Sequence, residues 1–232
     1  MKKGLAFVFL LIGSYLMSNA QRPLEEKYIS PNFEKFNVHF FNNISRKYGI
    51  KKKNLWGKTK RINTAKGRYI ILYYYDDGTG YNYYEYDSNN TLKRRVTEWN
   101  DGFTDDIYTM PYRIYKDFYK NGNIRFKGVS RSRFYIGNVY YFFANGKKEK
   151  IENTDSGYRF NYERVVEYCK QNGIDILNKG DSVRVFKIKY ENLPSWSIES
   201  SNIKLRRTDI IVLNGETGTI IKEYQRPFPS KH

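Results

Sequence analysis

Apolar and polar positions alternate in short runs over much of the chain, which is the pattern of half-buried β-strands. The runs "RYIILYYY" and "YNYYEY" are rich in β-branched and aromatic residues, and between them lies the turn sequence Asp77-Gly78-Thr79-Gly80. The second run ends at another turn sequence, "DSNN", before the next strand-like run begins. Strands that alternate with tight turns predict an antiparallel meander, which we expect to occupy residues 68–155.

Two stretches within this region correspond to one another: "DFYKNGNIRFKG" and "YFFANGKKEKIE". Each has two aromatic residues, one further residue and then Asn-Gly, and the pairs Asn121-Gly122 and Asn145-Gly146 are 24 residues apart. Asn-Gly supplies the positive backbone angles of a tight hairpin turn, so both pairs are predicted to be hairpin tips. Aligning Leu92 with Ile124 makes "YEYDSNNTLKRR" a degenerate earlier copy. Such units do not bury an aromatic face alone and are expected to extend a common sheet.

The pattern changes after Asp155. "NYERVVEYCKQNG" places Tyr162, Val165, Val166 and Cys169 at helical spacing, and Asn172-Gly173 is a typical helix end. Three or four strand-like runs follow, and "NGETG" is the turn between the last two. Residues 156–232 are therefore predicted to form a small helix-plus-antiparallel-sheet unit, which makes the whole chain a β-rich α+β protein.

The first twenty residues have the layout of a secretory signal peptide. Lys2 and Lys3 precede an apolar run that ends in small residues, with cleavage expected between Ala20 and Gln21. The run is too short to span a bilayer, and no other segment is apolar enough to do so. Because residue 21 is Gln and not Cys, we expect no lipid anchor at the mature amino terminus. The chain is thus expected to be exported, to a periplasm or out of the cell.

Residues 21–67 are read as an irregular basic segment that leads into the first strand. Removal of residues 1–20 leaves 212 of the 232 residues, and the formal charge falls from +17 to +15 because Lys2 and Lys3 are lost. This excess favours anionic partners, although a solvated surface rich in Lys accounts for it equally well. The single cysteine, Cys169, excludes an internal disulfide, so packing of the 18 percent aromatic residues must provide stability.

One basic cluster is a candidate binding site. Its cations could neutralise phosphates or acidic sugars while its aromatic side chains stack on rings. Exposed lysines on a loop are the alternative interpretation, and export argues against an intracellular nucleic acid as the partner. The candidate polyanion-binding residues are Arg46, Lys47, Lys51, Lys52, Lys53, Trp56, Lys58, Lys60 and Arg61.

No motif in the sequence indicates catalysis, a metal or a cofactor. The two histidines are His39 and His232, and no pair of His or Cys residues has zinc-ligand spacing. Cys169 lies on the apolar stripe of the predicted helix, where a core residue is expected more often than a nucleophile. "WGKT" lacks the first glycine of a phosphate-binding loop, since residue 52 is Lys. The sequence therefore predicts a protein that is not an enzyme.

The hairpin stretches resemble the MORN-variant repeats of bacterial YwqK-like proteins. Asn138-Val139-Tyr140 stands where those repeats have a further glycine and a Trp. The resemblance implies a scaffold or interaction module without a catalytic centre. The residues that fit the repeat pattern are Tyr119, Asn121, Gly122, Ile124, Gly128, Gly137, Phe143, Asn145 and Gly146.

The carboxy-terminal stretch resembles the end of PepSY-type modules, in which a Trp-bearing strand precedes a hairpin closed by a Thr-Gly turn. Leu213 to Gly218 fits that turn, and the resemblance implies a protein that restrains a peptidase. From the sequence we therefore expect an exported interaction or scaffold protein. The alternatives are a binding module for an anionic envelope polymer and a peptidase-restraining protein.

Overall fold

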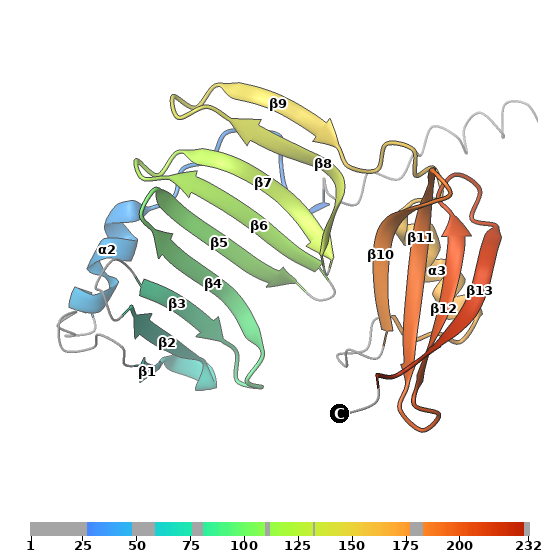
Figure 1. Ribbon diagram of the computed structural model, residues 1–232. Helices are drawn as coiled ribbons and strands as arrows, with labels where there is room; N and C mark the ends of the chain where they lie inside the picture. Colours follow the sequence, from blue (N-terminus) through green and yellow to red (C-terminus); the bar gives the residue numbers. More distant parts are fainter. Residues whose placement is uncertain are drawn as a thin grey trace, which may run out of the picture.

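The computed structural model describes residues 27–47, 59–75, 81–109, 112–131, 133–176 and 183–229. These residues form two antiparallel sheets, one of nine strands and one of four (Figure 1). A short helix, α3, precedes the smaller sheet. The β-rich α+β architecture predicted from the sequence is confirmed. The predicted signal segment, with Ala20 and Gln21, lies outside the described residues.

Both sheets are simple meanders in which each strand pairs with its neighbour in sequence. The larger sheet contains β1 (Thr59–Asn63), β2 (Tyr69–Tyr74), β3 (Tyr81–Tyr86), β4 (Leu92–Trp99), β5 (Gly102–Thr109), β6 (Tyr112–Tyr119), β7 (Ile124–Arg131), β8 (Phe134–Phe142) and β9 (Lys148–Asn153). The smaller sheet contains β10 (Val183–Tyr190), β11 (Leu193–Asn202), β12 (Arg207–Asn214) and β13 (Ile220–Pro227). The helical elements are α2 (Val38–Lys47), η3 (Ala65–Gly67) and α3 (Tyr162–Gln171).

The meander begins earlier than the sequence pattern indicates. Strand β1 lies within residues 21–67, which were expected to be irregular, and it pairs with β2 along its whole length. As an edge strand, β1 leaves all its residues but Ile62 exposed, so it shows little apolar alternation. The same stretch also contains α2, so part of it is helical where irregular structure was expected.

Three hairpins of the large sheet share one turn geometry. In each, the fourth residue after the last paired aromatic has a positive φ, of 60°, 84° and 85° respectively. Its amide donates to the carbonyl three residues earlier: Asn90 to Asp87, Gly122 to Tyr119, and Gly146 to Phe143. A register shift precedes each turn, at Glu85/Tyr86, Asp117/Phe118 and Tyr141/Phe142. The degenerate copy thus turns in the same way as the two Asn-Gly hairpins.

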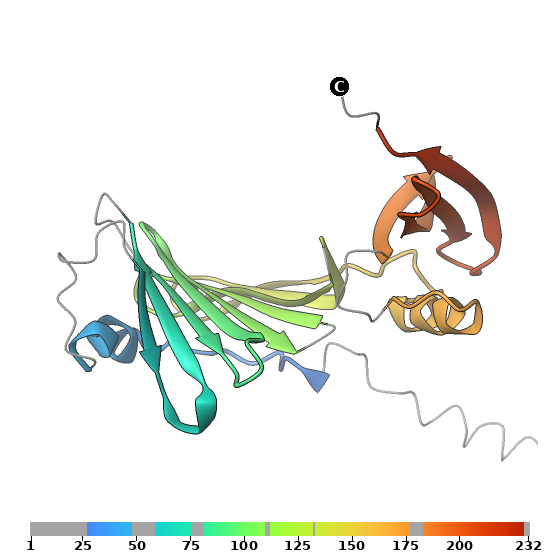
Figure 2. The same cartoon turned by 90° about the horizontal axis from the view of Figure 1, so that it is seen from below.

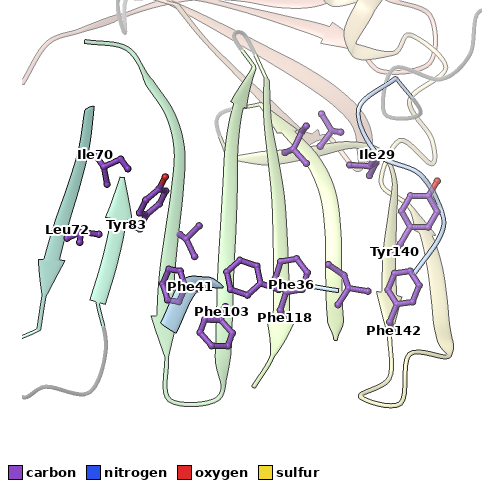
Figure 3. Close-up of a cluster of buried hydrophobic side chains, with 14 residues drawn as sticks. Ile29, Phe36, Phe41, Ile70, Leu72, Tyr83, Phe103, Phe118, Tyr140 and Phe142 are labelled. Carbon is purple, nitrogen blue, oxygen red and sulfur yellow. The ribbon is translucent and has the colours of Figure 1, made fainter. Parts of the chain in front are cut away.

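Residues 27–47 lie against one face of the large sheet, which we call the covered face (Figure 2). Phe36 is the centre of this contact, since its ring lies 5.1 Å from that of Phe103 and 5.2 Å from that of Phe118. Figure 3 shows these rings between the strands and α2, with Phe41 beside them. The segment also pairs with the sheet through a β-bridge between Lys35 and Asn123.

A buried ion pair fixes the same segment. The Lys127 side chain is fully buried and its Nζ donates to Oε1 of Glu34 at 2.6 Å. It also donates to the carbonyl of Asn32, while Lys116 pairs with the second oxygen of Glu34. Burial opposes ionisation of Glu34, but the two lysines hold its pKa below the usual 4.5. The covered face therefore depends on a carboxylate that comes from outside the sheet.

The carboxy-terminal unit packs α3 against one face of the small sheet. Asn161 caps the amino end of the helix, and its side chain accepts the amide of Arg164. Val165 and Cys169 are completely buried against Trp196 of β11. Ile136 of β8 belongs to the same apolar cluster, so this unit packs against the end of the large sheet. In both views the unit lies beyond the strand ends (Figures 1 and 2).

Lys187 joins the two sheets. From β10, its ammonium donates to the carbonyls of Tyr135 at 2.9 Å and Thr154 at 2.7 Å, and it pairs with Asp155. The ring of Trp196 lies 5.7 Å from the same ammonium. Burial lowers the pKa of Lys187 although Asp155 opposes that shift. Because its partners are residues at the end of the large sheet, Lys187 holds the two units together.

No described helix has the length and apolar character needed to cross a membrane.

Candidate functional site

Alternate residues of β1 to β8 point away from the covered face. They form a second surface, which we call the open face, because no described segment lies over its central strands (Figure 2). Most of its members are polar or aromatic, although Ile71 also lies on it, whereas the centre of the covered face is an apolar cluster. The open face comprises Arg61, Tyr69, Tyr73, Asn82, Tyr84, Tyr86, Arg95, Thr97, Thr104, Asp106, Arg113, Tyr115, Asp117, Phe126, Tyr135 and Tyr141.

Asp106 is the centre of the open face, and its carboxylate is completely buried. Arg95, directly across on β4, donates to its Oδ2 from Nε at 3.0 Å and from Nη2 at 2.5 Å. Arg113 places its Nε 3.6 Å from the other oxygen, Oδ1, which has no hydrogen-bond partner among the described residues. A buried acceptor without a hydrogen-bond donor lowers the stability of the folded protein.

A second ion-paired group lies beside the first. Arg125 donates to both oxygens of Asp117, at 2.6 and 3.0 Å, in a bidentate pair. Its remaining Nη1 donates to Asp101 in the β4–β5 turn at 2.7 Å. These contacts raise the pKa of Arg125 above its usual range. Together with Arg95, Arg113 and Asp106, these residues make a group of three arginines and three aspartates, and the same face also carries Arg61.

Aromatic rings flank this charged centre. On one side, the Phe126 ring lies 4.9 Å from that of Tyr141 and 5.1 Å from that of Tyr135. A Cβ at Gly128 would lie 2.9 Å from the ring of Tyr135, so this glycine makes room for that ring. Burial raises the pKa of Tyr135 to about 12. Each of these rings is nonetheless only partly buried.

The other side of the open face carries a stack of three planar groups. The rings of Tyr69 and Tyr86 lie 4.7 Å apart and nearly parallel. The Arg61 guanidinium covers the Tyr69 ring at 3.8 Å, a cation–π distance. Between this stack and the centre, Thr97 donates to the Asn82 side-chain oxygen at 2.7 Å. The face thus carries rings at both sides, and between them lie polar residues of which Thr97, Thr104 and Asp106 are buried.

The structure separates those members of the predicted basic cluster that it describes. Arg61 belongs to the open face. Lys60, the residue before it in β1, points to the covered face. Lys47 ends α2, on the covered side, with its Nζ 5.6 Å from the Phe40 ring. Lys51, Lys52, Lys53, Trp56 and Lys58 lie outside the described residues, as does the side chain of Arg46. The described cations do not form one patch.

The other residues considered for catalysis or metal binding lie away from the open face. Cys169 is buried in the small unit, and burial raises the pKa of its thiol to about 12, which disfavours the thiolate. His39 is exposed on α2, at the opposite end of the molecule from α3 (Figures 1 and 2). Among the described residues, no three His, Cys, Asp or Glu side chains are placed to hold a metal.

A polar cleft of about 640 Å³ lies where the large sheet meets the small unit. Its lining includes Asp155, Asn161 and Glu163. Asp155 is already engaged, since it pairs with Lys187 and accepts the Gly137 amide at 2.8 Å. The Asp155 carboxylate therefore serves the junction between the sheets.

Sequence reasoning missed the charged centre of the open face. Its signal was present in "LKRRVTEW" and "FTDDIYT", where adjacent charges interrupt strand-like runs. Arg94 and Arg95 face opposite sides of β4, as Asp105 and Asp106 do on β5, so each arginine pairs with one aspartate on its own face. Recognising this requires the strand register, which local sequence does not supply.

Comparison of the sequence with models of known protein families gives no match, and comparison with curated proteins gives none either.

Proposed function

We propose that this chain is an exported, non-catalytic interaction protein whose contact surface is the open face of the nine-stranded sheet. The observation that carries the proposal is the contrast between the two faces. Residues 27–47 bury the apolar face, while the aromatic and ion-paired face has no described segment over it. Patches of partly exposed tyrosine with arginine are typical of surfaces that bind partners.

The repeated hairpins support a scaffold role. Three of them share one turn and one register shift, and this regularity is what the proposed relationship to MORN-variant repeats requires. A repeated hairpin extends a sheet without creating a deep pocket, so it builds a broad surface. The packing of the small unit through Lys187 adds a fixed end to that surface.

Site-specific photocrosslinking in the producing cell tests the proposal. A photoreactive residue at position 84 or 115, on the open face, should yield a crosslinked partner. The same residue at position 224 serves as the control, because Tyr224 is 43% exposed on β13 of the small sheet. Equal crosslinking from all three positions, or none from positions 84 and 115, would contradict the proposal.

Export is tested separately by the mass of the mature protein. Cleavage between Ala20 and Gln21 predicts a chain of 212 residues that begins at Gln21. A full-length chain retained in the cytoplasm would contradict this part of the proposal.

Of the two other functions expected from the sequence, binding of an anionic polymer through the basic cluster remains a prediction. The separation of Arg61 from Lys47 and Lys60 gives it no support. Peptidase restraint by the small unit also remains a prediction, and inhibition of a peptidase by the mature protein would test it.

A further inference from the structure

We infer that the turn between β11 and β12 attaches the protein reversibly to the surface of a bilayer that contains anionic phospholipids. We call this turn, residues 202–207, the basic tip. It belongs to the small sheet, so the inference does not depend on the function proposed for the open face. Three observations support it: two exposed aliphatic side chains, the charge around them and the bonding of the backbone.

The aliphatic side chains of the basic tip are unusually exposed. Ile203 and Leu205 are 78% and 57% exposed, the two highest values among the large apolar side chains that the structure describes. Figure 1 shows the turn projecting below the ends of β10 and β13. Single apolar residues are common on protein surfaces, whereas apolar groups gathered at one place mark a contact with a partner or a membrane. A projecting tip can enter a bilayer surface without a matching groove.

The charge around these side chains is positive. Lys204 lies between the two aliphatic residues and Arg206 follows them, and both cations are exposed. Arg207 is paired with Asp209 at 2.9 Å. No acidic residue occurs between Glu199 and Asp209. Long basic side chains can reach lipid phosphates while neighbouring aliphatic groups lie deeper, so this order of residues matches an anionic lipid surface.

The opposite end of β11 provides a comparison. The β10–β11 turn at that end contains Glu191 and Asn192, and the next residue, Leu193, is 48% exposed. Both turns therefore present an exposed leucine from the same strand. They differ in charge, since one carries cations and the other a carboxylate. Anionic lipids attract the basic tip and not the second turn.

The backbone of the basic tip is hydrogen-bonded within the protein. The amide of Arg206 donates to the carbonyl of Ile203 at 3.2 Å, and that of Leu205 donates to Oδ1 of Asn202 at 3.1 Å. The amide of Phe228 donates to the carbonyl of Arg206 at 2.9 Å, which ties the tip to the end of β13. Backbone groups without partners are costly among lipid chains. These bonds lower that cost, so the tip can enter the lipid surface in its present shape.

The side chains of the tip also distinguish a lipid surface from a nucleic acid. Residues 202–207 include no aromatic ring that could stack on a base. Binding to a nucleic acid would depend on cations alone, whereas a lipid surface also accepts the two aliphatic side chains. Loss of binding when an aliphatic residue is replaced is therefore the informative result.

Co-sedimentation of the mature chain with vesicles tests the inference. One set of vesicles contains phosphatidylcholine alone, and the other contains equal amounts of phosphatidylcholine and phosphatidylglycerol. We expect binding to the second set only, and weaker binding at about 0.5 M NaCl, where screening acts within a few ångströms. The mature chain is used because the apolar run near the amino terminus would itself bind vesicles.

Variants of the tip assign the binding to its side chains. Leu205→Ser should weaken binding about tenfold, because it removes apolar area from the contact. Lys204→Gln should weaken it about fivefold, which corresponds to about 1 kcal/mol for one cation at an anionic surface. The matched control is Leu193→Ser, which should bind as the unchanged chain does. All three side chains are exposed, and circular dichroism establishes that each variant is folded.

A fluorescent label reports whether the tip itself enters the lipid. Ile203→Cys can be labelled selectively with a dye that is sensitive to polarity, because the one natural cysteine, Cys169, is buried. The emission should shift to the blue when vesicles with phosphatidylglycerol are added. Leu193→Cys with the same dye is the control and should show no shift.

Several results would overturn the inference. They are no sedimentation with the anionic vesicles, equal sedimentation with both sets, equal losses in Leu205→Ser and Leu193→Ser, and no shift from the dye at position 203. A dimer in light scattering that Leu205→Ser dissociates would assign the tip to a second copy of the chain and would also overturn it. Crosslinking from positions 84 and 115 is a separate measurement, so the function proposed for the open face can stand or fail independently.

Discussion

The two faces of the nine-stranded sheet bury charge by different routes. On the covered face, Lys127 is fully buried and its carboxylate partner, Glu34, comes from the segment that crosses the sheet. On the open face, Asp106 is fully buried and its partners, Arg95 and Arg113, come from neighbouring strands. The difference teaches that the charge of Lys127 is completed by another segment, whereas the charge of Asp106 is completed by the sheet itself, as is that of Asp105 on the covered face. Substitutions in residues 27–47 should therefore destabilise the covered face far more than the open face.

The largest effect should follow Phe36→Ala. Its ring is buried among those of Phe41, Phe103 and Phe118, and removal of a buried Phe side chain costs about 3–4 kcal/mol. Urea unfolding of the variant measures the loss. On the open face, Tyr84→Ala should cost less than about 1 kcal/mol because the ring is only partly buried. Equal losses of unfolding free energy in the two variants would contradict the difference between the faces.

Glu34→Gln should cost about 2–3 kcal/mol at neutral pH, since it leaves Lys127 buried without a carboxylate. The pKa of Glu34 is depressed in the folded state, so its stabilisation is present above pH 4.5 and is lost as the pH falls through the lower folded value. Unfolding curves of the wild type and E34Q should converge in acid. A difference that persists at low pH would contradict the role given to this ion pair.

The three related turns provide a graded test of how far the covering segment reaches. A Cβ at Gly122 would lie 2.8 Å from the backbone oxygen of Phe36, whereas at Gly146 it would meet only the Phe33 ring, at 2.9 Å. Both glycines have positive φ. We expect Gly122→Ala to cost about 2 kcal/mol and Gly146→Ala about 1 kcal/mol, measured by urea unfolding. The reverse order would contradict the close approach of Phe36.

The corresponding position in the third turn is Asn90, which keeps a positive φ without glycine. Asn90→Gly should change the stability by no more than about 0.5 kcal/mol, because Asn already tolerates this conformation. A large stabilisation would indicate strain in this turn that the other two lack.

The smallest effect is expected in alkali. Burial raises the pKa of Tyr135 on the open face, and of Tyr112 near the covered face, to about 12. A raised folded pKa means that stability is complete below pH 10, the value of unfolded tyrosine, and is lost as the pH rises towards 12. After allowance for partial exposure, Tyr135→Phe should reduce this loss by about 1 kcal/mol in urea unfolding.

Tyr112→Phe is the matched variant for the other side of the sheet. A similar reduction in the alkaline loss would show that rings on the two faces are desolvated to a similar extent. No change for Tyr135→Phe would mean that the open-face rings are as hydrated as in the unfolded chain.

Local patterns were sufficient for the meander, for α3 and for the turns at Asn121-Gly122 and Asn145-Gly146, because alternation and turn residues report the conformation of their own neighbourhood. Strand β1 was missed because an exposed edge strand needs no apolar alternation. The charged centre of the open face was missed. Its Arg–Asp pairs depend on which strands are neighbours, and residues 11 apart such as Arg95 and Asp106 give no local signal of contact.

The shared turn of the three hairpins has a consequence for the history of the molecule. The large meander does not close on itself, since β1 and β9 are its two edges. Duplication or deletion of one hairpin would therefore lengthen or shorten the sheet by two strands, roughly 10 Å, without disturbing the remaining pairings. Selection could therefore change the width of this sheet by whole hairpins, while each hairpin keeps its own turn.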